Sequence, residues 1–223
     1  MQVIARIRNG FPEKFGVPRQ SGIVNTTEAQ IVFEPVYRNP DAVRGLEEFS
    51  HIWLLWVFSE AVREGWSPMV RPPRLGGNQR VGVFATRSPF RPNEIGLSSV
   101  RLTKIEYHKE LGPVLHVTGA DLIDGTPILD IKPYVPFVDS HPDAEGGFAD
   151  RHKNDGLEVR FPEEWKKGME EQTAETICAL LAQDPRPGYQ ADQSRIYGMQ
   201  YEGYEIRFQV EGKLLTVCEV RKI

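Results

Sequence analysis

Cysteine is scarce in this 223-residue chain, which argues against a disulfide-stabilised fold. The only two, Cys178 and Cys218, fall in a helical pattern and a strand pattern, so we expect free buried thiols in a reducing compartment. The five histidines lack the i,i+4 pairing and the cysteine partners of a zinc site. We therefore expect no metal.

Long apolar runs are also missing. No stretch approaches the length of roughly 20 residues that spans a membrane, and Met1–Arg8 alternates like a strand without the apolar core of a signal peptide. We expect a cytoplasmic protein with no membrane contact. Walker loops, nucleophile elbows and Gly-x-Gly-x-x-Gly fingerprints do not occur. A nucleotide cofactor, if one binds, is therefore not held by a Rossmann loop.

Positive charge is concentrated in one part of an acidic chain. Eight of the 27 basic residues but only two of the 31 acidic residues lie between Arg63 and Lys104, which gives +6 there and −10 over the rest. Such a distribution is typical of local recognition of a phosphate-bearing partner, in contrast to a general nucleic-acid coat.

Prolines and glycines fix the backbone within this basic segment, between Arg71 and Val100. Loops of restricted conformation that carry guanidinium groups are suited to binding an anion or a nucleic acid. Each arginine taken singly is equally consistent with a solvated loop. The whole set favours a site, and its members are Arg71, Arg74, Arg80, Arg87 and Arg91.

Before residue 140 the apolar pattern is almost entirely that of strands. His51–Phe58 is apolar on both alternating faces, which predicts a central buried strand whose tryptophans pack in the core. A short helix capped by Asp41 is expected at residues 41–49. Many strands with little helix favour a closed barrel or a sandwich. The other expected strands are 2–8, 30–33, 81–85, 97–107, 114–119 and 127–133.

The periodicity changes beyond the polar segment 139–160, which we interpret as a linker. Glu163–Ala182 has the spacing of one amphipathic helix, and Asp184–Pro187 stops it. Residues 204–210 and 214–220 form a predicted hairpin. The chain is thus expected to comprise a mainly β N-terminal barrel (1–138), a linker (139–160) and a small α+β C-terminal domain (161–223).

Three polar clusters carry groups suited to chemistry. Asp121–Asp124 places two carboxylates at a turn. They either accept hydrogen bonds from ribose hydroxyls or belong to an ordinary Asp-rich turn. Asp130–Tyr134 ends a strand with an acid, a lysine and a phenol, which suit proton transfer or a structural ion pair. The rigid Asp184–Pro187 loop either aims its arginine at a ligand or only ends the helix.

Eight motifs occur in order along the chain: Lys14–Gln20, Asp41–Glu47, Arg71–Asn78, Gly82–Ser88, Phe90–Asn93, Asp124–Pro127, Asp130–Tyr134 and Asp184–Pro187. Together they resemble the bacterial TrmO (YaeB/TsaA) family of S-adenosylmethionine-dependent tRNA adenine-N6 methyltransferases. The resemblance that they carry covers nearly the whole chain, and residues 143–165 match poorly. The resemblance implies a non-Rossmann β-barrel that binds S-adenosylmethionine. It also implies methylation of N6 on the threonylcarbamoyl-adenosine immediately 3′ of the anticodon, in tRNAs that read codons beginning with A.

A homodimer with the cofactor near the subunit interface is a further implication of the resemblance. At Ser59-Glu60 the chain departs from its relatives, which often have His-Gln there. Carried over by motif, the cofactor contacts are Pro18, Arg19, Gln20, Ser59, Glu60, Arg87, Leu97, Asp121, Leu122, Ile123 and Asp124.

The same resemblance gives expected roles for the polar clusters. Asp130 or Asp184 would accept the proton of N6, and Tyr134 would orient the base, so the expected catalytic set is Asp130, Lys132, Tyr134 and Asp184. Arg91 or Arg186 would bind the threonylcarbamoyl carboxylate. The expected tRNA contacts are Arg71, Arg74, Arg80, Arg91, Asn93 and Arg186.

Two other interpretations stay open from the sequence. A non-catalytic barrel that binds S-adenosylmethionine or RNA as a sensor or adaptor would bind the cofactor without turnover. A hydrolase that uses paired aspartates would act without a methyl donor. Fold alone does not separate them, because barrels host many functions.

Overall fold

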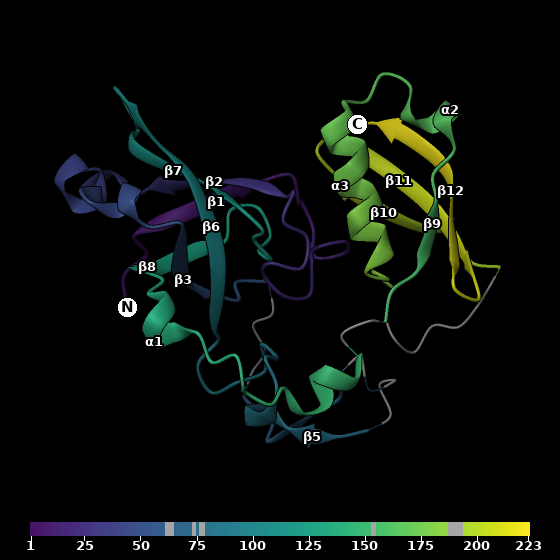
Figure 1. Ribbon diagram of the computed structural model, residues 1–223, viewed down its shortest axis with the longest axis horizontal. Coiled ribbons are helices and arrows are strands. Elements are labelled where there is room, and N and C mark those ends of the chain that lie inside the picture. The colour runs from purple at the N-terminus through teal and green to yellow at the C-terminus, as the bar shows by residue number, and fades with distance from the viewer. Residues whose placement is uncertain (61–64, 73–74, 76–78, 153–154, 187–193) are drawn as a thin grey trace.

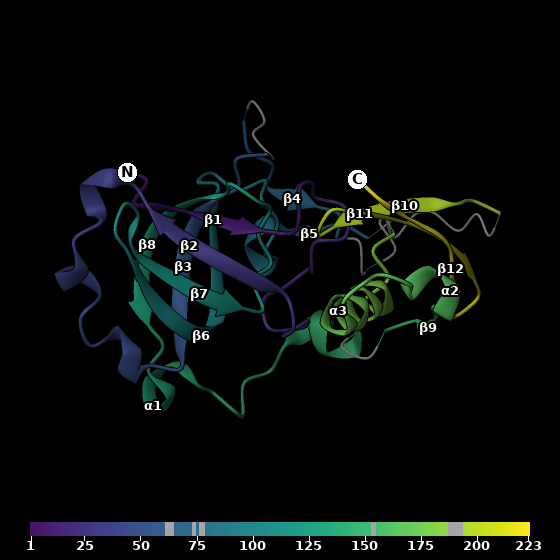
Figure 2. The ribbon, with the colours of Figure 1, turned by 90° about the horizontal axis from the view of Figure 1, so that it is seen from above.

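The computed structural model describes residues 1–223 except 61–64, 73–74, 76–78, 153–154 and 187–193. Two units lie next to each other in both views (Figures 1 and 2): a β-barrel from the N-terminal part of the chain, and a sheet with a helix on it from the C-terminal part. Among the described residues, no helix is both long and apolar enough to cross a membrane.

Six strands close the barrel in the order β1-β2-β7-β6-β3-β8, and every neighbouring pair is antiparallel. The mainly β N-terminal barrel expected from the sequence is therefore confirmed. Closure pairs both edges of the sheet, which stabilises an assembly of short strands. The strands are β1 (Ala5–Asn9), β2 (Glu28–Phe33), β3 (His51–Val57), β6 (Ile95–His108), β7 (Gly112–Thr118) and β8 (Pro127–Pro133).

Alternate residues of these strands fill the barrel. Ile52, Leu54 and Trp56 of β3 point inward and are buried, as the sequence predicted for Trp56. The outward residues of β3 are half-buried, so this strand is not buried on both faces as expected. Ser98 on β6 is a polar residue at an inward position of the barrel, and it is fully buried.

Two segments differ from the sequence prediction within the N-terminal unit. The expected helix at 41–49 is wrong: it is two 3-10 turns, η2 (Pro40–Val43) and η3 (Leu46–Glu48), and the side chain of Asn39 caps the first. The expected strand at 81–85 ends after β5 (Val81–Gly82).

The rest of that predicted strand curls into a 3-10 turn, η5 (Val83–Ala85). The Thr86 hydroxyl donates to the carbonyl oxygen of Val83, which bends the chain there. Only β4 (Met69–Val70) pairs with β5 among the described residues, as a two-stranded ribbon. Figure 1 shows β5 apart from the strands of the barrel.

The C-terminal unit is a mixed four-stranded sheet of order β10-β11-β12-β9, in which β9 runs parallel to β12. This confirms the small α+β domain. Its elements are β9 (Glu158–Arg160), α2 (Glu163–Lys166), α3 (Glu171–Ala182), β10 (Tyr197–Tyr201), β11 (Tyr204–Glu211) and β12 (Leu214–Lys222). The single helix expected over 163–182 is wrong, because Gly168 adopts a left-handed φ of +79° between α2 and α3.

Between the two units run α1 (Pro136–Asp139) and η6 (Gly147–His152), within or next to the segment interpreted as a linker. The boundaries of the three regions stay a prediction. A further 3-10 turn, η1 (Pro35–Tyr37), follows β2.

The loop from Gly10 to Thr26 belongs to the N-terminal unit but lies against the other. Phe11 and Val24 are buried in the same apolar cluster as residues of α3 and β10–β12. The Thr176 hydroxyl donates to the carbonyl of Thr26. This loop therefore ties the two units together.

Candidate functional site

A chain of hydrogen bonds runs from the barrel interior to its surface. The indole Nε1 of Trp56 donates to the hydroxyl of Ser98 over 2.9 Å. That hydroxyl in turn donates to Oδ1 of Asp121 over 2.5 Å. Antiparallel pairing of β3 with β6 brings the first two side chains together. The buried indole therefore fixes the carboxylate that follows β7.

The carboxylate of Asp121 is largely withdrawn from water. Burial raises its pKa, while hydrogen bonds from Ser98 and from the backbone of Ser21, and the charge of Arg87, oppose the rise. A carboxylate in such surroundings has a strong preference for a cationic or hydroxyl-bearing neighbour. Perturbed groups of this kind are concentrated at functional sites.

Arg87 supplies the cation. Its Nη1 donates to Oε1 of Gln20 over 2.5 Å, and Nε2 of Gln20 donates to the carbonyl of Arg19. The Arg87 side chain is exposed, as is 52% of Leu97, which precedes Ser98 on β6. We call this group the Arg87 cluster: Gln20, Arg87, Leu97, Ser98 and Asp121. It unites residues from distant parts of the chain.

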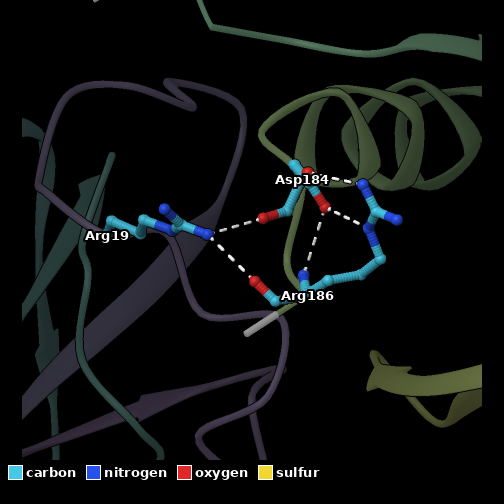
Figure 3. A network of polar contacts seen from close by, with 3 residues as sticks. All are labelled: Arg19, Asp184 and Arg186. Atoms are coloured by element: carbon cyan, nitrogen blue, oxygen red, sulfur yellow. Dashed lines mark hydrogen bonds and ion pairs between the residues drawn. The ribbon is translucent and has the colours of Figure 1, made fainter. Parts of the chain in front are cut away.

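Arg19 points the other way, toward the C-terminal unit (Figure 3). Its Nη2 donates to the carbonyl oxygens of Asp184 and Arg186, over 2.8 and 3.1 Å. The Asp184 carboxylate accepts two bonds from the guanidinium of Arg186, over 2.8 and 2.9 Å, and this pairing raises the pKa of Arg186. The loop after α3 is thereby held beside the loop that carries Gln20.

The other residues carried over as cofactor contacts shape the neighbouring backbone. Pro18 and Leu122 are buried. Oδ1 of Asp124 accepts from the backbone N–H of Asn9, and the carbonyl of Ile123 accepts from the Thr126 hydroxyl, which fixes the turn before β8. Ser59 and Glu60 are exposed just after β3.

The expected catalytic residues divide between the two units. On β8, Nζ of Lys132 lies 3.0 Å from Oδ2 of Asp130 in an exposed ion pair. The ring of Tyr134 packs against Trp53, with 5.5 Å between ring centroids. Within the described part of the chain, no hydrogen bond or ion pair joins this group to Asp184, which follows α3.

The expected tRNA contacts lie mainly around the ribbon β4–β5. Arg71 and Arg80 are exposed beside it, as is Asn93 in the loop before β6. Nη1 of Arg91 is committed to the carbonyls of Val83 and Thr86, over 3.1 and 2.7 Å, so Arg91 holds the η5 turn. Arg74 lies outside the described residues.

Sequence reasoning missed Ser98 and the hydrogen bond that it accepts from Trp56. A signal was present: Ser98 occupies an inward position of an alternating strand, in line with Val100 and Leu102. A hydroxyl at such a position requires a partner inside the barrel.

Both units match known protein families. Residues 6–140 match the tRNA-methyltransferase O N-terminal domain and residues 154–223 the TrmO C-terminal domain. The tRNA (adenine(37)-N6)-methyltransferase of Escherichia coli is 44% identical over 215 residues, covering 93% of this chain and 91% of that protein. The enzyme of that name from Eikenella corrodens is 50% identical over 176 residues, covering 78% of this chain and 98% of its own.

A solved structure supports the same family. The crystal structure of TrmO from Pseudomonas aeruginosa superposes with a TM-score of 0.79 at 35% identity, covering 100% of this chain and 97% of the other. A putative S-adenosylmethionine-dependent methyltransferase from the same organism is 43% identical over 205 residues, covering 88% and 86% of the two chains. The resemblance seen in the motifs is confirmed, and the chain belongs to the TrmO family.

Proposed function

We propose that this protein is an S-adenosylmethionine-dependent tRNA methyltransferase that modifies N6 of adenine 37. Relatives of that name are 44% and 50% identical to it. The structural observation that carries the proposal is the Arg87 cluster, a convergence of cation, amide and semi-buried carboxylate beside an arginine-bearing ribbon. A site of this composition lies next to a surface suited to phosphates.

The groups of the cluster match those of S-adenosylmethionine. Its amino-acid part carries a carboxylate, for which Arg87 is the natural partner, and an ammonium. Its ribose diol and its amino groups need acceptors, which Asp121 and the side chain of Gln20 provide. The exposed side chain of Leu97 offers an apolar surface to the adenine. We therefore assign cofactor binding to these residues, with Pro18, Arg19, Ser59, Glu60 and residues 122–124 shaping the walls.

When bound, S-adenosylmethionine supplies an electrophilic methyl group. The adenine N6 is a weak nucleophile because its lone pair is delocalised into the ring. The main task of the protein is to hold that nitrogen in line behind the methyl, since correct positioning provides several orders of magnitude in rate. We assign the orientation of the base to Tyr134, whose ring packs against Trp53.

Asp130 is the preferred acceptor for the N6 proton. Its pairing with Lys132 is exposed and leaves lone pairs open to a substrate. Both oxygens of Asp184 are already held by the guanidinium of Arg186, so Asp184 serves better to position the loop after α3. Lys132 orients the Asp130 carboxylate through their ion pair.

On the RNA side, Arg71 and Arg80 are exposed and suited to phosphates. The substrate we infer is the threonylcarbamoyl form of the adenosine, whose carboxylate calls for a guanidinium. Arg91 holds the η5 turn through one of its three nitrogens, so its guanidinium can serve a ligand as well, and Arg186 is the alternative. We further propose a cytoplasmic homodimer with the cofactor near the subunit interface.

Transfer of a labelled methyl group tests the proposed function. The protein is incubated with methyl-labelled S-adenosylmethionine and tRNA-Thr isolated from a strain that lacks the endogenous enzyme. A matched tRNA-Thr with guanosine at position 37 serves as control. Label is expected in the first tRNA and absent from the second. Cofactor binding without transfer to either tRNA would contradict the proposal and favour a sensor.

A further inference from the structure

Two large aromatic side chains are exposed together beside the ribbon β4–β5. Half of Trp66 and 70% of Phe84 are exposed, and their rings are stacked, with centroids 6.2 Å apart and planes inclined by 25°. Met69 on β4, three residues after Trp66, is also exposed. Clustered exposed side chains of this size mark a surface that binds something.

The position of Phe84 is fixed by the turn that carries it. Phe84 is the middle residue of η5, whose first residue, Val83, is buried. The guanidinium carbon of Arg91 lies 5.5 Å from the centre of the Phe84 ring, and its Nη1 donates to carbonyls on both sides of the turn. The ring is therefore presented on a preorganised turn, which lowers the entropic cost of binding a ligand.

The charge around the rings is positive. Arg71 directly follows β4 and Arg80 directly precedes β5, so the two exposed guanidinium groups flank the paired residues Val70 and Val81. The same turn leads into Arg87 of the cofactor cluster. A second copy of this surface would bring like charges together, which is unfavourable. A polyanion that also carries flat apolar groups fits both properties.

We propose that Trp66 and Phe84 form a stacking platform for unpaired bases of the tRNA anticodon loop, with Arg71 and Arg80 on the flanking phosphates. Aromatic rings combined with arginines are the usual means by which proteins grip single-stranded nucleic acid. The inference rests on the proposed function for the identity of the RNA. It adds the residues and the stacking by which that RNA is held.

The test measures binding of the tRNA-Thr anticodon stem-loop by fluorescence anisotropy of an end-labelled RNA. Trp66→Ala and Phe84→Ala are each expected to weaken binding about tenfold, whereas the stacking-competent Trp66→Phe and Phe84→Tyr remain within about twofold of the wild type. Tyr107→Ala is the matched control. Tyr107 is similarly exposed, but it lies about 40 Å along β6 from the end that adjoins Arg91.

Tryptophan emission gives an independent readout. The stem-loop is expected to quench part of the emission of the wild type, and Trp66→Phe is expected to bind normally while losing that part of the quenching. This result stands even if the alanine variants fold poorly. Calorimetry with S-adenosylmethionine checks that each variant is folded. Equal quenching in the wild type and Trp66→Phe, or unchanged affinity in both folded alanine variants, would overturn the platform.

Two further outcomes separate the platform from the proposed function. A wild type that binds the stem-loop with the Trp66 signal but transfers no methyl group would refute the function and support the platform. Methyl transfer with an unchanged KM for tRNA in the folded alanine variants would refute the platform alone. Sedimentation of the same variants tests whether a second copy of the protein covers this surface instead of RNA. A loss of dimer with unchanged RNA affinity would show that the surface joins two copies.

Discussion

Trp56 and Gly96 lie directly opposite each other on β3 and β6, and the indole ring occupies the space that a side chain at position 96 would need. A Cβ built on Gly96 would lie 2.2 Å from the indole Cε2. The same indole donates to Ser98, which in turn donates to Asp121. The size of one residue on β6 thus controls the position of a carboxylate at the cofactor site.

Substitution of Gly96 by alanine is expected to displace Trp56 and lower the free energy of unfolding by about 1–3 kcal/mol. Affinity for S-adenosylmethionine should fall with it, because the support of Asp121 is disturbed. Denaturant unfolding and calorimetry measure the two effects. Gly82→Ala is the control, since a Cβ there meets nothing within 4 Å. Equal stability of the two variants would show that the barrel repacks freely around the indole.

Arg87→Ala is expected to weaken binding of S-adenosylmethionine by about tenfold or more, the usual cost of losing a hydrogen bond to a charged group. The side chain of Arg87 is exposed, so the free energy of unfolding should change little. Isothermal titration calorimetry measures the affinity directly. An unchanged dissociation constant would remove Arg87 from the cofactor site.

The raised pKa of Asp121 predicts a pH dependence of stability. Burial places the folded-state pKa above the ordinary value of 3.8, so the folded protein binds this proton more tightly than the unfolded chain. The contribution of Asp121 to stability is therefore full below 3.8 and is lost as the pH rises through the folded-state pKa.

Asp121→Asn removes this titration. Relative to the wild type, the free energy of unfolding of the variant should increase as the pH rises above 3.8 and through the folded-state pKa of Asp121. A constant offset from local changes does not affect the slope of that difference. Urea unfolding at a series of pH values measures it. A difference that is flat across this range would show that Asp121 is not desolvated.

Salt dependence reports on the phosphates bound by the ribbon. Arg71→Ala and Arg80→Ala should each weaken tRNA binding and reduce the slope of log Kd against log salt by about 0.7 for every phosphate of a single-stranded loop that is no longer neutralised. Lys109→Ala, at the exposed tip between β6 and β7, should leave the slope unchanged. Identical slopes for all three variants would place the phosphates elsewhere.

The sequence predicted those parts of the structure that depend on local pattern. The strand at 127–133 was predicted with its observed limits, because prolines bound it and it contains the β-branched residues Ile128 and Ile131. The break at Gly168 was missed, because the apolar spacing continues across it from α2 into α3. The strand β10 (Tyr197–Tyr201) was missed as well, since it is short and contains a glycine.

The candidate site could be predicted from the sequence only in part, for a similar reason. Motifs pointed to Arg87 and Asp121, but the link from Asp121 to Ser98 joins residues 23 positions apart. Such a link depends on strand register in the closed barrel, which the residues themselves do not reveal. The commitment of Arg91 to the backbone of the η5 turn depends equally on tertiary structure.

Nucleoside mass spectrometry of tRNA-Thr after reaction with S-adenosylmethionine is the most direct test of the proposed function, with and without prior threonylcarbamoyl modification of adenosine 37. We predict one added methyl group on N6 of the threonylcarbamoyl nucleoside and none on the unmodified adenosine. Methyl groups at any other position, or none on either tRNA while the cofactor binds, would contradict the assignment of this site to modification of that adenosine.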